Sequence, residues 1–252
     1  MELRLTPKPG LVDLMDNGSH PDLSVPLMEQ SIGIVAQYLE EITASLCAEE
    51  PFVRQKEIAI RAEGRLYTEL GTNTHKGYIF LSGMLLIASH HAGSADESAV
   101  RRSLSAVSQA FFATAEEQDT HGGRARRQFH TGGIVREAID AYPSLFEVAL
   151  PEFRRVLAQR ACVTTASFAM MAMLMQTIDD TTTLHRGGSE GLAQVRRDGR
   201  ALEQLIAEGG DCVAFLERLN DDYKRLNLTI GGVADMLGIA FGCLIAGEEI
   251  AP

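Results

Sequence analysis

The ten residues 179–188, Asp-Asp-Thr-Thr-Thr-Leu-His-Arg-Gly-Gly, place two neighbouring carboxylates before a histidine and an arginine. The apolar run 162–178 precedes them. At the C-terminal end of a helix, two acids face the negative end of its dipole and are costly to bury. A divalent cation removes this cost, and Mg²⁺ prefers oxygen ligands shared with phosphates. We therefore expect Asp179 and Asp180 to bind Mg²⁺ and Arg186 to contact phosphate, the alternative being an exposed helix end.

A second polar motif, Gly-Thr-Asn-Thr-His-Lys-Gly at residues 71–77, lies immediately before the apolar run 78–89. Its Thr and Asn residues are suited to cap the following helix, which leaves backbone N–H groups free beside Lys76. The spacing does not match the phosphate-binding P-loop. We expect Asn73 and Lys76 to bind an anion, and the alternative is a plain cap with a surface lysine.

The N-terminal segment contains a third motif. Residues 6–13 are Thr-Pro-Lys-Pro-Gly-Leu-Val-Asp, and residues 17–22 are Asn-Gly-Ser-His-Pro-Asp. Prolines and glycines fix the backbone of such a segment, so that Lys8, His20 and Asp22 are presented from a rigid loop. The alternative is a capping loop, with Asp22 near the start of a helix.

Two weaker signals lie in the middle of the chain. Residues 116–133 contain four glycines and three arginines, which predicts either a mobile lid over an anionic substrate or a solvated loop. Arg136 and Glu137 follow as a charged pair, which by itself is more typical of a surface salt bridge.

The elements that must position these motifs are helical. Apolar residues from Met28 to Leu46 recur every three or four positions, which predicts a helix, and Pro26 suits its first turn. The runs 78–89, 162–178 and 228–245 are apolar nearly all round, as in helices at the centre of a bundle. With no clear linker, we predict an all-α, single-domain multi-helix bundle with buried central helices over residues 1–252.

The composition limits the classes of function. The net charge is −11 without a long basic tract, which argues against nucleic-acid binding but allows a locally basic site. No run predicts a membrane span, and no signal peptide is evident at residues 1–13. The four cysteines form no Cys-x-x-Cys pair, which is typical of reduced thiols in a cytoplasmic protein.

Taken in order, these motifs resemble the triphosphoribosyl-dephospho-CoA synthase family. The resemblance rests on the segments 8–13, 71–77, 121–143 and 179–188, and on Asn227 with the Gly-Gly-x-Ala-Asp at 231–235. It covers nearly the whole chain. It implies an all-helical enzyme that transfers the 5-triphosphoribosyl group of ATP to the 2′-hydroxyl of 3′-dephospho-CoA and releases adenine.

The resemblance also implies roles for the candidate residues. Asp22 or Glu137 would be the general base, and His20 or His75 the donor to adenine. Lys8, Asn73, Lys76, Arg136 and Arg186 would bind ATP phosphates, with Mg²⁺ on Asp179 and Asp180. A homodimer is left open. Two alternatives are a related helical nucleotide-binding enzyme with a different acceptor and a catalytically inactive binding homologue.

Overall fold

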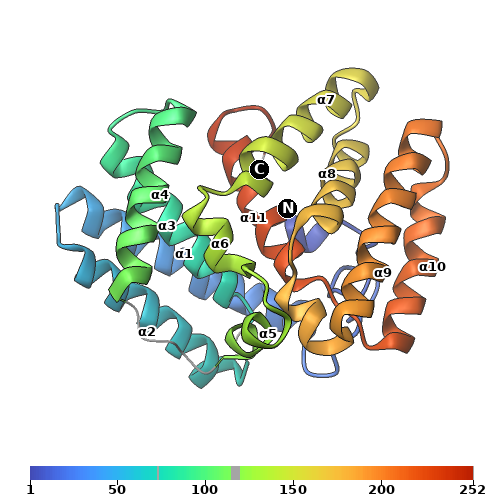
Figure 1. The fold of residues 1–252 in the computed structure, drawn as a ribbon, viewed down its shortest axis with the longest axis horizontal. Coiled ribbons are helices and arrows are strands. Elements are labelled where there is room, and N and C mark those ends of the chain that lie inside the picture. Colours follow the sequence, from blue (N-terminus) through green and yellow to red (C-terminus); the bar gives the residue numbers. More distant parts are fainter. Residues whose placement is uncertain (73, 115–119, 252) are drawn as a thin grey trace. The chain divides into compact units, whose positions relative to one another are not determined.

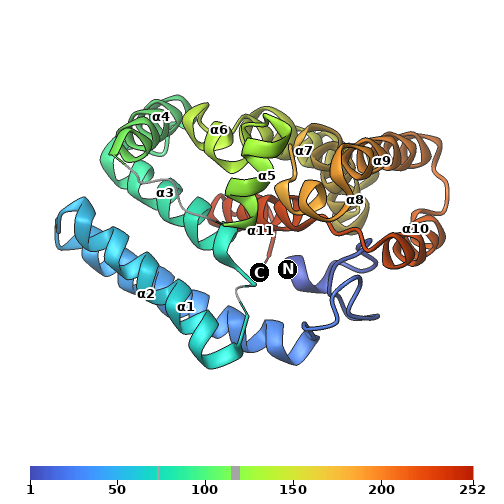
Figure 2. The ribbon, with the colours of Figure 1, turned by 60° about the horizontal axis from the view of Figure 1, so that its bottom comes forward.

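Helices make up the regular structure of the protein. The computed structural model describes residues 1–72, 74–114 and 120–251, and over these ranges it contains eleven α-helices, a 3₁₀ turn, a π-helical turn and no strand (Figure 1). The predicted all-α fold is confirmed, and a second view of the same helices is given in Figure 2. None of the helices in these ranges is long and apolar enough to cross a membrane.

The chain divides into two compact units. Unit 1 consists of Met1–Val25, Glu117–Ile134 and Pro143–Pro252, and unit 2 consists of Pro26–Glu116 and Val135–Tyr142. This division does not test whether the units fold together, so the single-domain assignment stays a prediction.

Unit 1 is built around two apolar helices. Nine residues of α8 are buried, and α8 packs against α7, α9 and α11. The predicted central helices at 162–178 and 228–245 correspond to α8 and α11, which confirms both. The elements of this unit are η1 (Glu2–Arg4), α5 (His121–Phe129), η2 (Ser144–Ala149), α7 (Leu150–Arg160), α8 (Val163–Thr177), α9 (Thr181–Glu208), α10 (Cys212–Leu226) and α11 (Gly231–Ala246).

Unit 2 has its own core, formed by side chains of α1, α2 and α3. Tyr38 of α1 is buried at its centre and donates a hydrogen bond to the Ile79 carbonyl of α3, at 2.9 Å. The third predicted central helix, 78–89, lies within α3. The helices are α1 (Val25–Cys47), α2 (Phe52–Leu70), α3 (Lys76–Ala92), α4 (Glu97–Thr114) and α6 (Gly133–Ile139), whose first two residues belong to unit 1.

Two sequence-based details are corrected. The apolar positions from Met28 to Leu46 predicted the helix, but not every one of them is buried: Ile32 is exposed, while Ile34 and Tyr38 are buried. The segment predicted as a lid or loop contains helix α5, because the Thr120 hydroxyl accepts a hydrogen bond from the Gly123 N–H and caps its first turn. Residues 116–119 of that segment lie outside the described residues.

Candidate functional site

Asp180 begins helix α9 rather than ending the helix before it. Helix α8 ends at Thr177, and the Asp180 carboxylate accepts hydrogen bonds from the N–H groups of Thr182 and Thr183, at 2.9 and 3.0 Å. This is the N-cap arrangement, in which an acid faces the positive end of the helix dipole. The prediction that the two acids oppose a helix C-terminus is therefore wrong for Asp180.

The same carboxylate also joins the start of α11. Its second oxygen accepts from the Val233 N–H at 3.1 Å, and only 1% of Asp180 is exposed. Burial raises the pKa of Asp180, and the N–H groups of α9 and α11, including that of Gly232, oppose this by favouring the ionised form. A Cβ at Gly232 would lie 3.1 Å from this oxygen, so a side chain there would force the carboxylate to shift by a few tenths of an ångström.

These contacts decide how well the acidic pair fits a metal ion. Both oxygens of Asp180 are used by backbone N–H groups inside the protein, so its side chain does not fit the predicted role of an Mg²⁺ ligand. Asp179 is half-exposed, but it accepts from Arg196 at 2.6 Å and from the Thr131 hydroxyl. Within the described residues, no group of three or more His, Cys, Asp or Glu side chains is arranged to hold a metal.

A hydrogen-bonded network joins the N-terminal loop to α9 and to the start of α11. Arg186 donates to the Ser19 carbonyl at 2.7 Å and to His20 Nδ1 at 3.2 Å. Because Nδ1 accepts, Nε2 carries the proton of the neutral ring and donates it to Thr229 Oγ1 at 2.9 Å. The Thr183 hydroxyl closes the network on the Thr229 carbonyl, at 2.7 Å. The network thus brings together the predicted motifs at residues 17–22 and 179–188.

The network fixes the protonation state of His20. Burial and, to a smaller extent, the positive charge of Arg186 lower its pKa to about 4, while Asp22 acts in the opposite direction. A neutral His20 whose only ring proton is held by Thr229 is poorly suited to donate to adenine. Asp22 is exposed near this pair and makes no hydrogen bond or ion pair within the described residues.

A group of basic side chains, two arginines and two histidines, extends from this network to α5. The rings of His121 and His185 lie with their centroids 4.3 Å apart, and Arg124 donates to His121 Nδ1 at 3.1 Å. Burial lowers the pKa of His185, and so do His121, Arg124 and Arg186. The potential at His185 is therefore positive, as an anion site requires. We call these four residues the cation cluster: His121, Arg124, His185 and Arg186.

Lys8 is used inside the protein. Its side chain is fully buried, and its Nζ donates to both the carbonyl and the carboxylate of Glu2, each at 2.6 Å. Its backbone N–H is held by Asp13 at 2.7 Å. This arrangement ties the start of the chain to the N-terminal loop and gives no support to the predicted phosphate contact of Lys8.

Unit 2 contains the motif at residues 71–77. His75 is largely buried, its Nδ1 is hydrogen-bonded to the hydroxyls of Ser31 and Thr74, and burial lowers its pKa to about 4. Lys76 begins α3 and pairs with Glu63 at 3.1 Å, with 41% of its side chain exposed. Asn73 lies outside the described residues.

Arg136 and Glu137, the predicted charged pair on α6, have different neighbours. Arg136 is exposed and forms an ion pair with Asp140 one turn further along the helix. Glu137 is half-buried, and its charge contributes to raising the pKa of the buried Tyr142, for which burial is the main cause. The predicted roles of both residues stay predictions.

Sequence reasoning gave no role to His121, although its contact with His185 completes the cation cluster. Arg124 was noticed only as part of a loop. The three arginines Arg196, Arg197 and Arg200 on the second half of α9 were also missed, since they lie outside any recognisable motif. A signal was present in their spacing, because residues one turn apart share a helix face.

Comparison with known proteins identifies relatives over almost the entire chain. A family model described as ATP:dephospho-CoA triphosphoribosyl transferase matches residues 1–249. The probable 2-(5″-triphosphoribosyl)-3′-dephosphocoenzyme-A synthase of Pseudomonas putida is 34% identical, over 94% of this chain and 87% of the relative. The Klebsiella pneumoniae 2-(5″-triphosphoribosyl)-3′-dephosphocoenzyme-A synthase is also 34% identical, with the same coverage. No solved structure matches.

Proposed function

Because the chain belongs to the ATP:dephospho-CoA triphosphoribosyl transferase family, we propose that it transfers the 5-triphosphoribosyl group of ATP to the 2′-hydroxyl of 3′-dephospho-CoA. The hydroxyl oxygen bonds to C1′ of the ATP ribose, and the bond from C1′ to adenine breaks. The hydroxyl proton passes to a base, and adenine leaves with the bond's electron pair and takes up a proton. The alternatives, a different acceptor or an inactive homologue, are not favoured by the family match.

The cation cluster is the observation that supports a role for unit 1 in binding the triphosphate. Two guanidinium groups and two imidazoles lie together. The other three members lower the pKa of His185, which indicates a positive potential there. A triphosphate is the part of the substrates with the highest negative charge, and fixed cations hold such a group in place for reaction. We therefore assign the triphosphate of ATP to the cation cluster.

Asp22 is our preferred general base within unit 1. It is exposed beside His20 and Arg186, and no partner among the described residues competes for its carboxylate. A carboxylate that accepts the attacking hydroxyl's proton contributes about 10²–10⁴-fold. His20 is better suited to hold Arg186 in place than to protonate adenine, since Thr229 accepts its only ring proton. The predicted roles of His75, Lys76 and Glu137 in unit 2 stay predictions.

Mg²⁺ enters our proposal with the substrate. The donor set of Asp180 does not fit a metal, whereas the triphosphate itself supplies oxygen ligands of the kind that Mg²⁺ prefers. We propose that MgATP is the form bound and that the side chains of the cation cluster contact the phosphate oxygens left free.

Two further parts of the proposal concern the protein as a whole. The four free cysteines suit a reducing compartment, and we propose that the protein works in the cytoplasm. We also propose a homodimer. In its support, the exposed apolar residues Val53, Ile60 and Tyr67 recur every seven positions along one face of α2.

The test is adenine release from MgATP and dephospho-CoA, with the product identified by mass. Arg124→Ala removes one cluster cation and should raise the KM for ATP about tenfold, the effect of one lost charge-assisted contact. Arg127→Ala is the matched control, because Arg127 is an exposed arginine on the same helix and is absent from the groups that act on His185. Its KM for ATP should change less than about twofold.

Each failure has a distinct meaning. Loss of ATP without the coupled product would favour a different acceptor, and ATP binding without turnover would favour an inactive homologue. Equal changes in KM for the Arg124 and Arg127 variants would contradict the assignment of the triphosphate to the cation cluster.

A further inference from the structure

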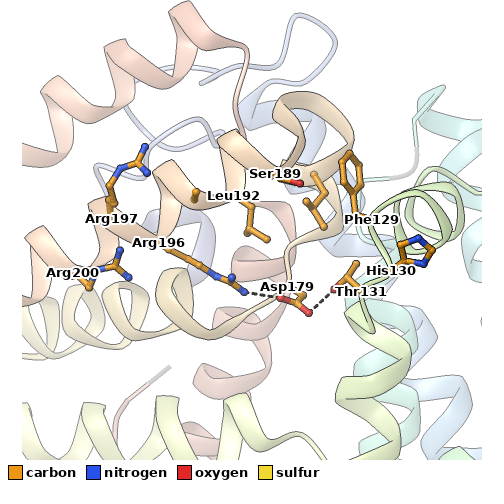
Figure 3. A pocket seen from close by; sticks show the side chains of 11 residues that line it. Phe129, His130, Thr131, Asp179, Ser189, Leu192, Arg196, Arg197 and Arg200 are labelled. Atoms are coloured by element: carbon orange, nitrogen blue, oxygen red, sulfur yellow. Dashed lines mark hydrogen bonds and ion pairs between the residues drawn. The ribbon is translucent and has the colours of Figure 1, made fainter.

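A second basic site lies in unit 1, beyond the cation cluster. It is a pocket of about 500 Å³ between the C-terminal end of α5 and one side of α9 (Figure 3). Three arginines of α9, Arg196, Arg197 and Arg200, line it together with a single acid, Asp179. With three positive charges and one negative charge, the charged side chains of the pocket carry a net charge of about +2.

The arginines are only partly satisfied by the protein. Figure 3 shows Arg196 extended toward Asp179, which it contacts at 2.6 Å, while its Nε is buried without a partner. Arg197 donates to the neutral amide oxygen of Gln194 at 2.6 Å. Arg200 makes no hydrogen bond or ion pair within the described part of the chain. Guanidinium groups in this state retain N–H donors for an anion.

The other residues that line the pocket indicate what kind of groups the rest of the ligand carries. Leu184, Leu192 and Ala193 give the pocket an apolar side, and Phe129 offers an aromatic ring. The hydroxyl of Ser189 and the ring of His130 add polar groups at its edge (Figure 3). A few polar groups set among apolar side chains are typical of pockets for organic ligands rather than for bare ions. The ligand expected here is an organic anion with a charge of about −2.

We propose that this pocket binds the diphosphate of 3′-dephospho-CoA, with its apolar side against the organic groups next to that diphosphate. The inference rests on the proposed function, since it assigns the acceptor of that reaction. In dephospho-CoA the diphosphate links two ester groups, so each phosphorus carries one negative charge and the total matches the pocket. MgATP carries a similar net charge, so charge alone does not decide between the two substrates. Since the triphosphate of ATP is assigned to the cation cluster, the two substrates would occupy different parts of α9.

Direct binding tests the assignment without turnover. Titration calorimetry of the full chain with dephospho-CoA should show binding that Arg200→Ala weakens about tenfold, because one fixed cation is lost. Arg218→Ala is the matched control, since Arg218 is an exposed arginine on α10 of the same unit and also lacks a partner within the described residues. It should change the affinity less than about twofold. ATP affinity should be unchanged in both variants.

The alternatives give different results. If Arg200→Ala weakens ATP as much as dephospho-CoA, the pocket holds ATP and the proposal is overturned. It is also overturned if the wild-type chain does not bind dephospho-CoA, or if the Arg200 and Arg218 variants bind it equally. A failure of the proposed function would appear as missing adenine release while the dependence of dephospho-CoA binding on Arg200 remained. Circular dichroism of each variant confirms that it is folded.

Discussion

Replacing Asp180 by Asn tests whether Asp180 is a structural carboxylate or a metal ligand. The Asn side chain keeps one oxygen, which suffices to cap α9, since Asn and Asp are similar N-caps. Its amide NH₂ then faces the Val233 N–H, which now donates to Asp180 at 3.1 Å. The change removes a bond to a charged group, about 1.5–3 kcal/mol, and leaves a buried N–H unpaired, about 1–3 kcal/mol.

Since these terms overlap, we expect Asp180→Asn to lower the free energy of unfolding by about 3 kcal/mol. Asp179→Asn is the matched variant. Asp179 and Arg196 are 42% and 36% exposed, and an ion pair of that kind contributes less than about 1 kcal/mol. The two neighbouring substitutions remove the same formal charge, so the difference between them reports what burial and backbone hydrogen bonds add at Asp180 beyond the exposed contacts of Asp179.

Urea unfolding followed by far-ultraviolet circular dichroism measures both variants. The slope of the unfolding free energy against urea concentration must be compared as well as the midpoint of the transition. A chain with two compact units need not unfold in one step. If the two acids stood at a helix C-terminus, as expected from the sequence, removing both charges would instead leave the protein as stable or more stable. Our interpretation of Asp180 is refuted if Asp180→Asn is as stable as Asp179→Asn.

Two further predictions concern unit 2 and the pH dependence of stability. Because burial lowers the pKa values of His20 and His75 from 6.5 to about 4, both are neutral when folded, and the Tm should fall as the pH decreases from 6.5 toward 4. His75→Gln should flatten this profile, and an unchanged profile would exclude His75 as a cause. Lys76→Ala should weaken ATP binding in calorimetry with a stability loss below about 1 kcal/mol, because the pair with Glu63 is partly exposed. Glu63→Gln should leave ATP binding undiminished, and a Lys76 variant that binds ATP like wild type would show Lys76 to be a surface residue.

The fold could be predicted where burial alone decides it. The apolar runs that became α3, α8 and α11 have no polar face, so they are stable only inside a helical core. The helix boundaries depend on capping residues, and the prediction did not take account of the N-cap at residues 178–183. An Asp followed by three threonines is itself an N-cap signal, and it places a new helix where the sequence was interpreted as the end of one.

The site was less predictable because its residues depend on contacts between distant segments. Arg186 and His20 were named from their motifs, but the proton on His20 Nε2 follows only from the simultaneous contacts with Arg186 and Thr229. Lys8 belongs to a conspicuous motif, yet its side chain is fully buried and paired with Glu2, which the motif alone did not indicate. Motif spacing therefore identified which residues gather, whereas hydrogen-bond partners determine what each can do.

The bend in α9 lets one helix carry both proposed anion sites. His185 and Arg196 are eleven residues apart, which in a straight helix is about three turns and about 16 Å along a single face. Gly188 lies between them with φ 61° and ψ −162°, so the helix changes direction there. A residue with a Cβ would be strained in that conformation by about 1–3 kcal/mol. The glycine thus separates a short segment that carries the cation cluster from a longer one that carries the arginine pocket, and it gives the two proposed anion sites different directions on one continuous element.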